Sequence, residues 1–308
     1  MSVDGIRLTE VDCDLCGGAS KKPLYSMPDL RRRVFDRVYR VVECLSCGHR
    51  FLSPRPDRES IPALYPESYY EQRGGGGRSQ GHTFSKRTGL LPIESGAILD
   101  VGCAGGEWLL TLGKKWKRTG LDFIPPKHPT EDFEIVVGEL PDAPFDDGSF
   151  DVVTAWGSLE HVESPSACFD AVGRILKPGG FFVFLVPNGD SLWSRRAYKE
   201  DIPRHLHFFR RKTVARYAEK HGFELERVSF PDGFYSQRPS ARGLFKRGIL
   251  LKTGLSWERI LTGDYGGWRW LLGAFGTFLD LALIHPPVER MFGGGGNLLA
   301  VLRKPERT

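Results

Sequence analysis

A short apolar strand that runs into a glycine-rich turn limits the fold of this chain more than any other feature. The stretch "ILDVGCAGGEW" (residues 98–108) starts with three apolar residues around Asp100 and continues with glycines at positions 102, 105 and 106. Glycine lets the backbone turn tightly from a strand into a helix, and it lets the backbone come close to a ligand. The stretch therefore predicts a strand–turn–helix unit with a ligand at the carboxyl end of the strand.

Strand-like and helix-like segments alternate after this turn. The expected strands are residues 98–101, 119–122, 134–137, 151–156, 181–186, 223–230 and 297–304. Between them, "PSACFDAVGRILKPGG" and "KTVARYAEKHGF" are typical of helices that end at glycine. Strands that alternate with helices predict an α/β fold built on a mostly parallel sheet.

Two acidic residues indicate the ligand of this fold. Asp100 lies in the first strand, where its charge would oppose a pyrophosphate and favour a ligand with a positive group. Asp122 ends the next expected strand, twenty residues after Gly102, where a carboxylate can bond ribose hydroxyls. S-adenosylmethionine combines a ribose, a cation and a carboxylate, and it is the cofactor that these positions favour.

Residues 98–229 resemble a class I S-adenosylmethionine-dependent methyltransferase. The matching motifs are "LDVGCAGG", "GLDF", "VVGELPDAPFDDGSFDVV", "LEHVESP" and "LKPGGFFVFLVPN", in the order and spacing of that family. The resemblance implies a Rossmann-like sheet whose last strand is antiparallel. It also implies cofactor contacts by Asp100, Gly102 and Gly106 at the methionine end, Asp122 at the ribose, and Phe123, Glu139 and Leu140 at the adenine. Trp156, at the end of the fourth strand, is expected either in the floor of the pocket or in the core.

Four of the six cysteines form two C-x-x-C pairs, Cys13 with Cys16 and Cys44 with Cys47. Each pair is followed by a glycine, and the spacing lets both thiolates face one ion. Four thiolates close a tetrahedral zinc site and leave no position for water, so the predicted zinc is structural. Residues 1–56 are therefore expected to form a zinc ribbon that needs its metal to fold, with His49 on the surface of a hairpin.

The rest of the chain divides into two parts. Residues 57–96 are expected to form a linker and lid, and residues 97–308 the methyltransferase domain, with a helical insertion at about 233–293. Residues 240–284 are apolar and aromatic with a basic edge, so amphipathic helices there could cover the acceptor site, touch a membrane surface, form a homodimer contact or add a core layer. No secretory pattern opens the chain, which is therefore expected in the cytoplasm, with or without membrane association.

A zinc ribbon before such a domain resembles bacterial methyltransferases of sugar and secondary-metabolite pathways. In those proteins, tyrosines after the ribbon and a histidine-rich segment after the fifth strand line the substrate site. The equivalent stretches here are "YPESYYE" and "DIPRHLHFF", although Arg204 replaces the acid that precedes the histidine in sugar C-methyltransferases.

These stretches supply the candidate catalytic residues, which are His161, His205, His207 and Tyr70, with Tyr69 beside it. Imidazole titrates near neutrality and can accept a proton from a hydroxyl or an activated carbon. The segment holding His205 and His207 is expected to be a loop over the acceptor, with Arg204 contacting an acidic group of that acceptor. Alternatively, these side chains only shape the pocket or anchor the loop.

The sequence thus predicts O- or C-methylation of a small molecule, such as a sugar, a nucleotide sugar or a secondary metabolite. Methylation of RNA, with the zinc module as a recognition module, is the main alternative, and a non-catalytic cofactor-binding protein is a third. Residues 97–187 carry a net charge of −7, and "VPNG" differs from the Asn/Asp-Pro-Pro-aromatic motif of amino-methylating base enzymes. Both observations disfavour a nucleic acid partner.

Overall fold

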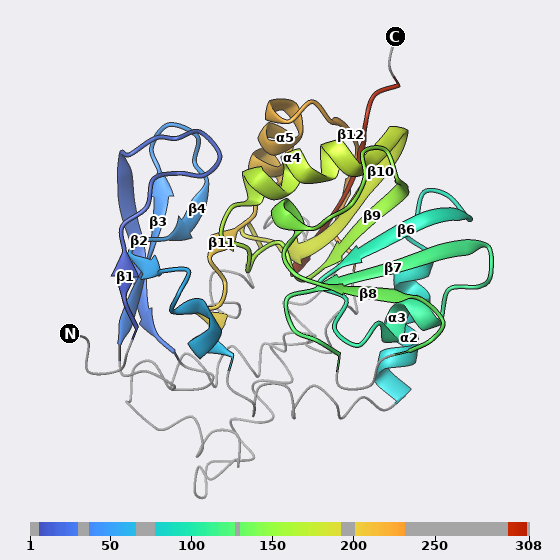
Figure 1. Cartoon of the computed structure of the whole chain (residues 1–308). Helices are drawn as coiled ribbons and strands as arrows, with labels where there is room; N and C mark the ends of the chain where they lie inside the picture. Colours follow the sequence, from blue (N-terminus) through green and yellow to red (C-terminus); the bar gives the residue numbers. More distant parts are fainter. Residues whose placement is uncertain are drawn as a thin grey trace, which may run out of the picture.

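The larger of the two main sheets has seven strands and lies on the right in Figure 1. A computed structural model describes residues 6–29, 37–65, 78–126, 130–191, 201–231 and 295–306. The strands of this sheet are β6 (Gly96–Val101), β7 (Trp116–Asp122), β8 (Glu134–Val137), β9 (Phe150–Trp156), β10 (Leu176–Pro187), β12 (Glu224–Ser229) and β13 (Asn297–Arg303). Their order is β12-β13-β10-β9-β6-β7-β8. Strand β13 is antiparallel to both of its neighbours, and β6 to β10 run parallel. The predicted Rossmann-like sheet with an antiparallel last strand is confirmed.

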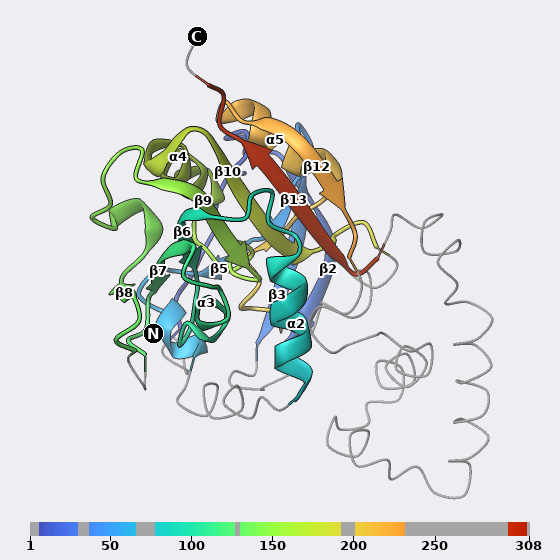
Figure 2. The ribbon, with the colours of Figure 1, turned by 90° about the vertical axis from the view of Figure 1, so that its right-hand side faces the viewer.

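Helices cover both faces of this sheet (Figures 1 and 2). One face carries α4 (Pro165–Ile175) and α5 (Arg211–Lys220), and the other carries α2 (Arg78–Thr88) and α3 (Glu107–Leu110). Alternate residues of β10 enter the two cores: Phe182 packs in the cluster of α4 and α5, and Val183 in the cluster of α3. The central strands β9, β10 and β13 are therefore mostly buried, whereas β8 and β12 at the sheet edges are partly exposed.

A second sheet lies beside the first and has four antiparallel strands. Three come from the N-terminal segment: β2 (Lys21–Pro28), β3 (Val38–Cys44) and β4 (Arg50–Leu52). The fourth, β11 (His207–Phe208), comes from the histidine-rich segment and pairs with β4, so that the order is β11-β4-β3-β2. The segment 201–209 was predicted to be a loop, and most of it consists of turn and loop, but residues 207–208 form a two-residue strand instead. Leu206 and Phe208 alternate into a core with residues of β3 and β4, which favours a strand.

The remaining elements join the two sheets. Strand β1 (Leu8–Thr9) pairs with β5 (Arg55–Pro56), and the short 3-10 helix η1 (Ile61–Leu64) follows. Helix α2 lies inside the predicted linker of residues 57–96 and contacts α3 through Thr88, whose hydroxyl accepts a hydrogen bond from Trp108. The predicted insertion at 233–293, with its segment 240–284, lies outside the described residues, as do Tyr69 and Tyr70. In the part of the chain that is described, no helix combines the length and the apolar character needed to cross a membrane.

Candidate functional site

The four predicted metal ligands form one cluster. The Sγ atoms of Cys13, Cys16, Cys44 and Cys47 all lie within 4.8 Å of one another. Two of these distances are 3.4 Å (Cys13 to Cys47) and 3.5 Å (Cys16 to Cys44). Four sulfurs at about 2.3 Å from one zinc ion would lie about 3.8 Å apart, so the cluster fits tetrahedral zinc. The φ angles of the two following glycines, 70° for Gly17 and 72° for Gly48, are in the left-handed region, which explains the glycine after each pair.

The glycine-rich turn has the geometry that the sequence predicts. Gly102 has a φ of 74°, and a Cβ atom there would collide with the side chain of Ser158. Ala104 adopts a left-handed φ of 54°, which glycine would adopt without strain. The carboxylate of Asp122 accepts a hydrogen bond from the backbone nitrogen of Ala104 at 2.8 Å, and from that of Ile124 at 3.1 Å. Asp122 thus holds the turn through these two hydrogen bonds.

Asp100 is buried directly before this turn. Its carboxylate accepts a hydrogen bond from Thr154 in the neighbouring strand β9, at 2.7 Å. Burial raises the pKa of Asp100 to about 7, against the opposing effect of the Arg87 guanidinium. A buried carboxylate of this kind suits a cationic ligand group, because the cation would restore the charged form.

Arg87 is a residue that the sequence did not indicate. It comes from the last turn of α2, and its guanidinium lies 5.5 Å from the ring centre of Trp156. The Nε atom of Arg87 is buried without a hydrogen-bond partner. Trp156 itself packs edge-on against Trp108 at 5.3 Å, so it belongs to the core and supports Arg87. A partly buried guanidinium whose charge acts on Asp100 can bind a carboxylate.

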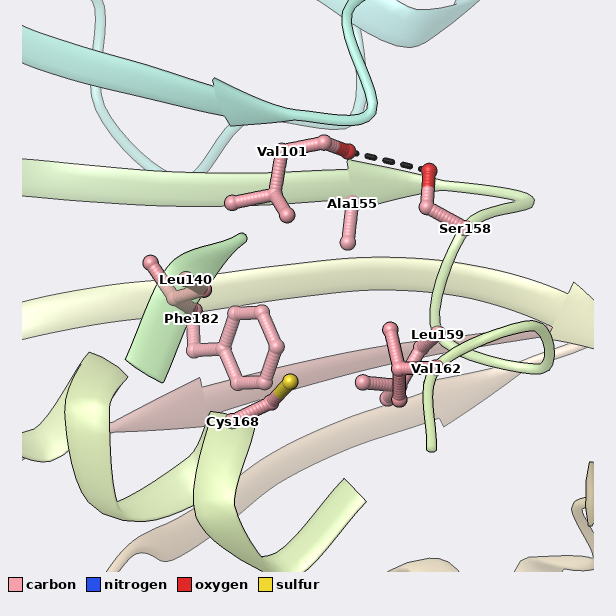
Figure 3. A pocket seen from close by; sticks show the side chains of 8 residues that line it. All are labelled: Val101, Leu140, Ala155, Ser158, Leu159, Val162, Cys168 and Phe182. Atoms are coloured by element: carbon pink, nitrogen blue, oxygen red, sulfur yellow. Dashed lines mark hydrogen bonds between the residues drawn. The ribbon is translucent and has the colours of Figure 1, made fainter. Parts of the chain in front are cut away.

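The predicted adenine residues follow the ends of strands β7 and β8. Phe123 is 47% exposed, whereas Leu140 is buried. Glu139 forms an ion pair with Arg58 at 3.0 Å, which ties this loop to the segment before η1. Leu140 also lines a small apolar pocket between α4 and the carboxyl ends of β6 and β9 (Figure 3). There the hydroxyl of Ser158 donates to the carbonyl of Val101 at 2.9 Å, which fixes the loop after β9 to the end of β6.

The structure brings together two of the candidate histidines. Donor atoms of His161, His205 and Glu160 lie within 4.8 Å of one another, and the two imidazole rings are 4.7 Å apart. Nε2 of His205 is 3.7 Å from a carboxylate oxygen of Asp201. His161 is partly exposed, while His205 and Glu160 are buried. These three side chains could accept a proton or ligate a divalent cation.

Two contacts set the state of His161. Its Nδ1 atom lies 3.0 Å from the carbonyl oxygen of Arg204 and 3.3 Å from the hydroxyl of Tyr65. Tyr65, which was not singled out in the sequence, also packs edge-on against Phe123 at 5.5 Å. It therefore connects the predicted adenine side with the histidine cluster.

His207 lies apart from this cluster. Its Nδ1 atom is 3.1 Å from Nε2 of His49, and its Nε2 atom is 3.3 Å from the carbonyl of Glu163. The side chain is buried, and this burial lowers the pKa of His207 to about 4. His49 is also fully buried, contrary to the expected surface position.

Arg204 is not available to an acceptor, and the prediction that it binds an acidic group there is wrong. Its side chain is fully buried and forms an ion pair with Asp29 at 3.1 Å. A second pair, with Asp201, measures 3.5 Å. A buried arginine needs such partners, and these carboxylates occupy its guanidinium.

Comparison with known proteins agrees with this geometry. Residues 79–228, just under half of the chain, match the family model described as a methyltransferase domain. A ubiquinone biosynthesis O-methyltransferase from Paracidovorax citrulli is 30% identical over 112 residues, which cover 32% of this chain and 47% of that protein. A demethylmenaquinone methyltransferase from Staphylococcus epidermidis is 37% identical over 108 residues, covering 31% of this chain and 45% of that protein. The chain thus spans just under half the length of these curated relatives.

Solved structures show the same fold. One chain of the complex between the Haloferax volcanii Trm112 methyltransferase activator and a methyltransferase superposes with a TM-score of 0.52 and 19% identity, covering 80% of this chain and 98% of that one. With the family match, this likeness identifies the seven-stranded sheet as a class I methyltransferase fold.

Proposed function

We propose that this chain, whose residues 79–228 match a methyltransferase domain, transfers a methyl group from S-adenosylmethionine to a small-molecule acceptor. The observation that carries the proposal is the set of side chains at one edge of the parallel sheet. Asp100 and Asp122 lie at the carboxyl ends of β6 and β7, and His161 follows β9 at that same edge. In an open α/β sheet this edge is where ligands bind.

Five side chains would hold the cofactor, each with a part of matching chemistry. Asp100 would face the cationic part, Arg87 the carboxylate, and Asp122 the ribose hydroxyls. Phe123 and Leu140 would contact the adenine. S-adenosylmethionine, when bound, supplies a methyl group on a positively charged sulfur.

The chain's own residues then orient the acceptor and accept its proton. We assign the base to His161, because it is the partly exposed member of the cluster with His205 and Glu160. The new bond joins the methyl carbon to an oxygen or carbon of the acceptor, while the bond from sulfur to that methyl breaks. The acceptor's proton passes to Nε2 of His161, and S-adenosylhomocysteine leaves.

The acceptor is proposed to be a sugar, a nucleotide sugar or a secondary metabolite, methylated on oxygen or carbon. One matched relative is named for ubiquinone biosynthesis and another for demethylmenaquinone, which supports a small acceptor over RNA. The four cysteines are proposed to bind one structural zinc ion, since their spacing and their thiol chemistry fit it.

The test is methyl transfer from labelled S-adenosylmethionine to four pools: nucleotide sugars, hydroxylated aromatic and quinone-like compounds, a bacterial metabolite extract and total RNA. Label in a small-molecule pool, lost in a His161→Ala variant, supports the proposal. Label that enters only RNA would support the alternative. Labelling must also fall in an Asp122→Ala variant. Labelling that does not depend on Asp122 contradicts the assigned cofactor site.

A further inference from the structure

The first cysteine pair is attached to the start of helix α4. Asp14 lies between Cys13 and Cys16, and its carboxylate accepts three hydrogen bonds. The donors are the hydroxyl of Ser164 at 2.6 Å, the backbone nitrogen of Ser166 at 2.9 Å and the hydroxyl of Tyr217 at 2.8 Å. Ser164 is the N-cap residue of α4. Asp14 therefore fixes this knuckle to the first turn of the helix.

The second cysteine pair is attached to strand β11. His49, two residues after Cys47, lies 3.1 Å from Nδ1 of His207, and the two rings stack with their centres 5.4 Å apart. His207 is also the partner of Phe51 in the β4–β11 pairing. Both imidazoles are buried, so their contact packs the segment between Cys47 and β4 against strand β11.

The two histidines assigned to the acceptor side, His161 and His205, lie close in sequence to these two attachments. His161 lies four residues before the start of α4, and His205 lies two residues before His207. In addition, the carbonyl of Glu160 accepts hydrogen bonds from the backbone nitrogens of Leu206 at 2.9 Å and His207 at 3.1 Å. Each acceptor histidine is thus within four residues of an element that a cysteine pair contacts.

We propose that the four-cysteine ribbon holds the acceptor side of the site in position, and that Asp14 and His207 are the positioning residues through which it does so. The inference rests on the proposed function only in naming His161 and His205 as acceptor residues. His207 fits this role better than that of a base, because both of its ring nitrogens contact groups inside the protein.

A separation of the two halves of the site follows from this arrangement. Strands β6 and β7 bond to strands of the main sheet, and the hydrogen-bond partners given above for Asp100 and Asp122 lie in that sheet or in the turns at its edge. Val42, Cys44, Cys47 and Phe51 of the ribbon belong to the core cluster that also holds residues of α4 and α5. The four cysteines would depend on their metal to stay in place, so loss of the metal should release β11 and the start of α4. The cofactor side should remain folded.

The first experiment is hydrogen exchange on the full chain, measured by mass spectrometry before and after zinc is removed with a chelator. We expect peptides covering residues 157–166 and 201–209 to exchange at least tenfold faster without zinc. Peptides of β6 and β7 should be unchanged, and S-adenosylhomocysteine should bind within threefold of its original affinity. Unchanged exchange in 157–166 and 201–209 overturns the proposal, and so does equal loss of protection in β6 and β7.

The second experiment keeps the metal and changes only the attachments. His207→Leu and Asp14→Asn should retain one zinc per chain and bind S-adenosylhomocysteine normally, but the ring ¹⁵N signals of His161 and His205 should shift. His207→Asn, which restores a polar atom near the position of Nδ1, should bring those signals back. Asp170→Asn is the matched control, because this exposed carboxylate of α4 pairs with His221 instead.

Unshifted His161 and His205 signals in both His207→Leu and Asp14→Asn contradict the inference. These readouts need no acceptor, so they stand even if no methyl transfer is found. A protein that binds neither S-adenosylmethionine nor S-adenosylhomocysteine before zinc removal contradicts the proposed function, and the ring signals then still report on positioning.

Discussion

The Nδ1 atom of His161 lies 3.0 Å from the carbonyl oxygen of Arg204. A carbonyl can only accept a hydrogen bond, so this contact favours the tautomer of His161 that carries its proton on Nδ1. Arg204 is held in turn by its buried ion pair with Asp29. An arginine that the sequence suggested as an acceptor contact therefore favours one tautomer of the histidine that we assign as the base.

We predict that His161 is the Nδ1-protonated tautomer in the neutral protein, as measured by ¹⁵N-histidine NMR. His161→Ala should lower kcat about 10²- to 10⁴-fold, the range for loss of a general base. Its affinity for S-adenosylmethionine should stay within twofold, since the described contacts of the ring are with Tyr65, His205 and Arg204. His221→Ala is the control, because this histidine is the C-cap residue of α5 and pairs with Asp170. A fall in kcat below tenfold would move the base to His205.

Asp122→Ala should weaken binding of S-adenosylmethionine by about 1.5–3 kcal/mol, the usual range for hydrogen bonds to a charged group. The variant loses both the expected ribose contact and the bond that holds the backbone of Ala104. Calorimetry checks the affinity. The control is Asp132→Ala, which removes an acidic side chain from the loop before β8. Equal affinities of Asp122→Ala and the unchanged protein would remove Asp122 from the cofactor site.

The sheet and the turn could be predicted because their signals are local. Apolar runs of strand length, glycines at left-handed positions and carboxylates at strand ends all lie within a few residues of one another. The two cysteine pairs carry a local signal as well, since each pair needs only its own turn. The order β12-β13-β10 was accessible only through resemblance to a family.

The acceptor side could not be predicted in this way, because it depends on contacts between distant residues. His49 and His207 are 158 positions apart, and Arg204 and Asp29 are 175 apart. A two-residue strand such as β11 has too few residues to show a period. The sequence suggests Arg204 as a contact for the acceptor, because it does not show that Arg204 is buried together with the carboxylate of Asp29.

Arg87 is predicted to bind the carboxylate of the cofactor. Arg87→Ala should weaken the binding of S-adenosylmethionine by about 1.5–3 kcal/mol. The decarboxylated form of the cofactor tests the partner directly: it should bind weakly to the unchanged protein and lose little further affinity in the variant. Lys86→Ala, the adjacent basic residue of α2, is the control. Equal losses for both ligands would mean that Arg87 acts elsewhere, for example by stabilising Asp100.

One zinc ion per chain is expected from elemental analysis of protein purified without added metal. Cys44→Ser should lower that content to below a tenth and destabilise residues 6–56, while cofactor binding remains. Cys168→Ser is the matched control, because this buried cysteine lines the apolar pocket and is not one of the four clustered thiols (Figure 3). Full zinc content in Cys44→Ser, or its absence from the unchanged protein, contradicts the site.

Cofactor affinity should fall as the pH drops below about 7, because of Asp100. Burial raises the pKa of Asp100 to about 7, so in the free protein the carboxyl is mostly protonated at pH 6. Binding of a cation beside it favours the carboxylate and lowers its pKa, so binding releases a proton. The affinity should then fall up to about tenfold for each pH unit below 7 and level off above it.

Calorimetry in two buffers of different ionisation enthalpy measures the released proton. Asp100→Asn should bind more weakly at pH 8 and lose this pH dependence. Any titration of the cofactor itself is common to both proteins, so parallel pH profiles for Asp100→Asn and the unchanged protein would show that Asp100 does not face the cation.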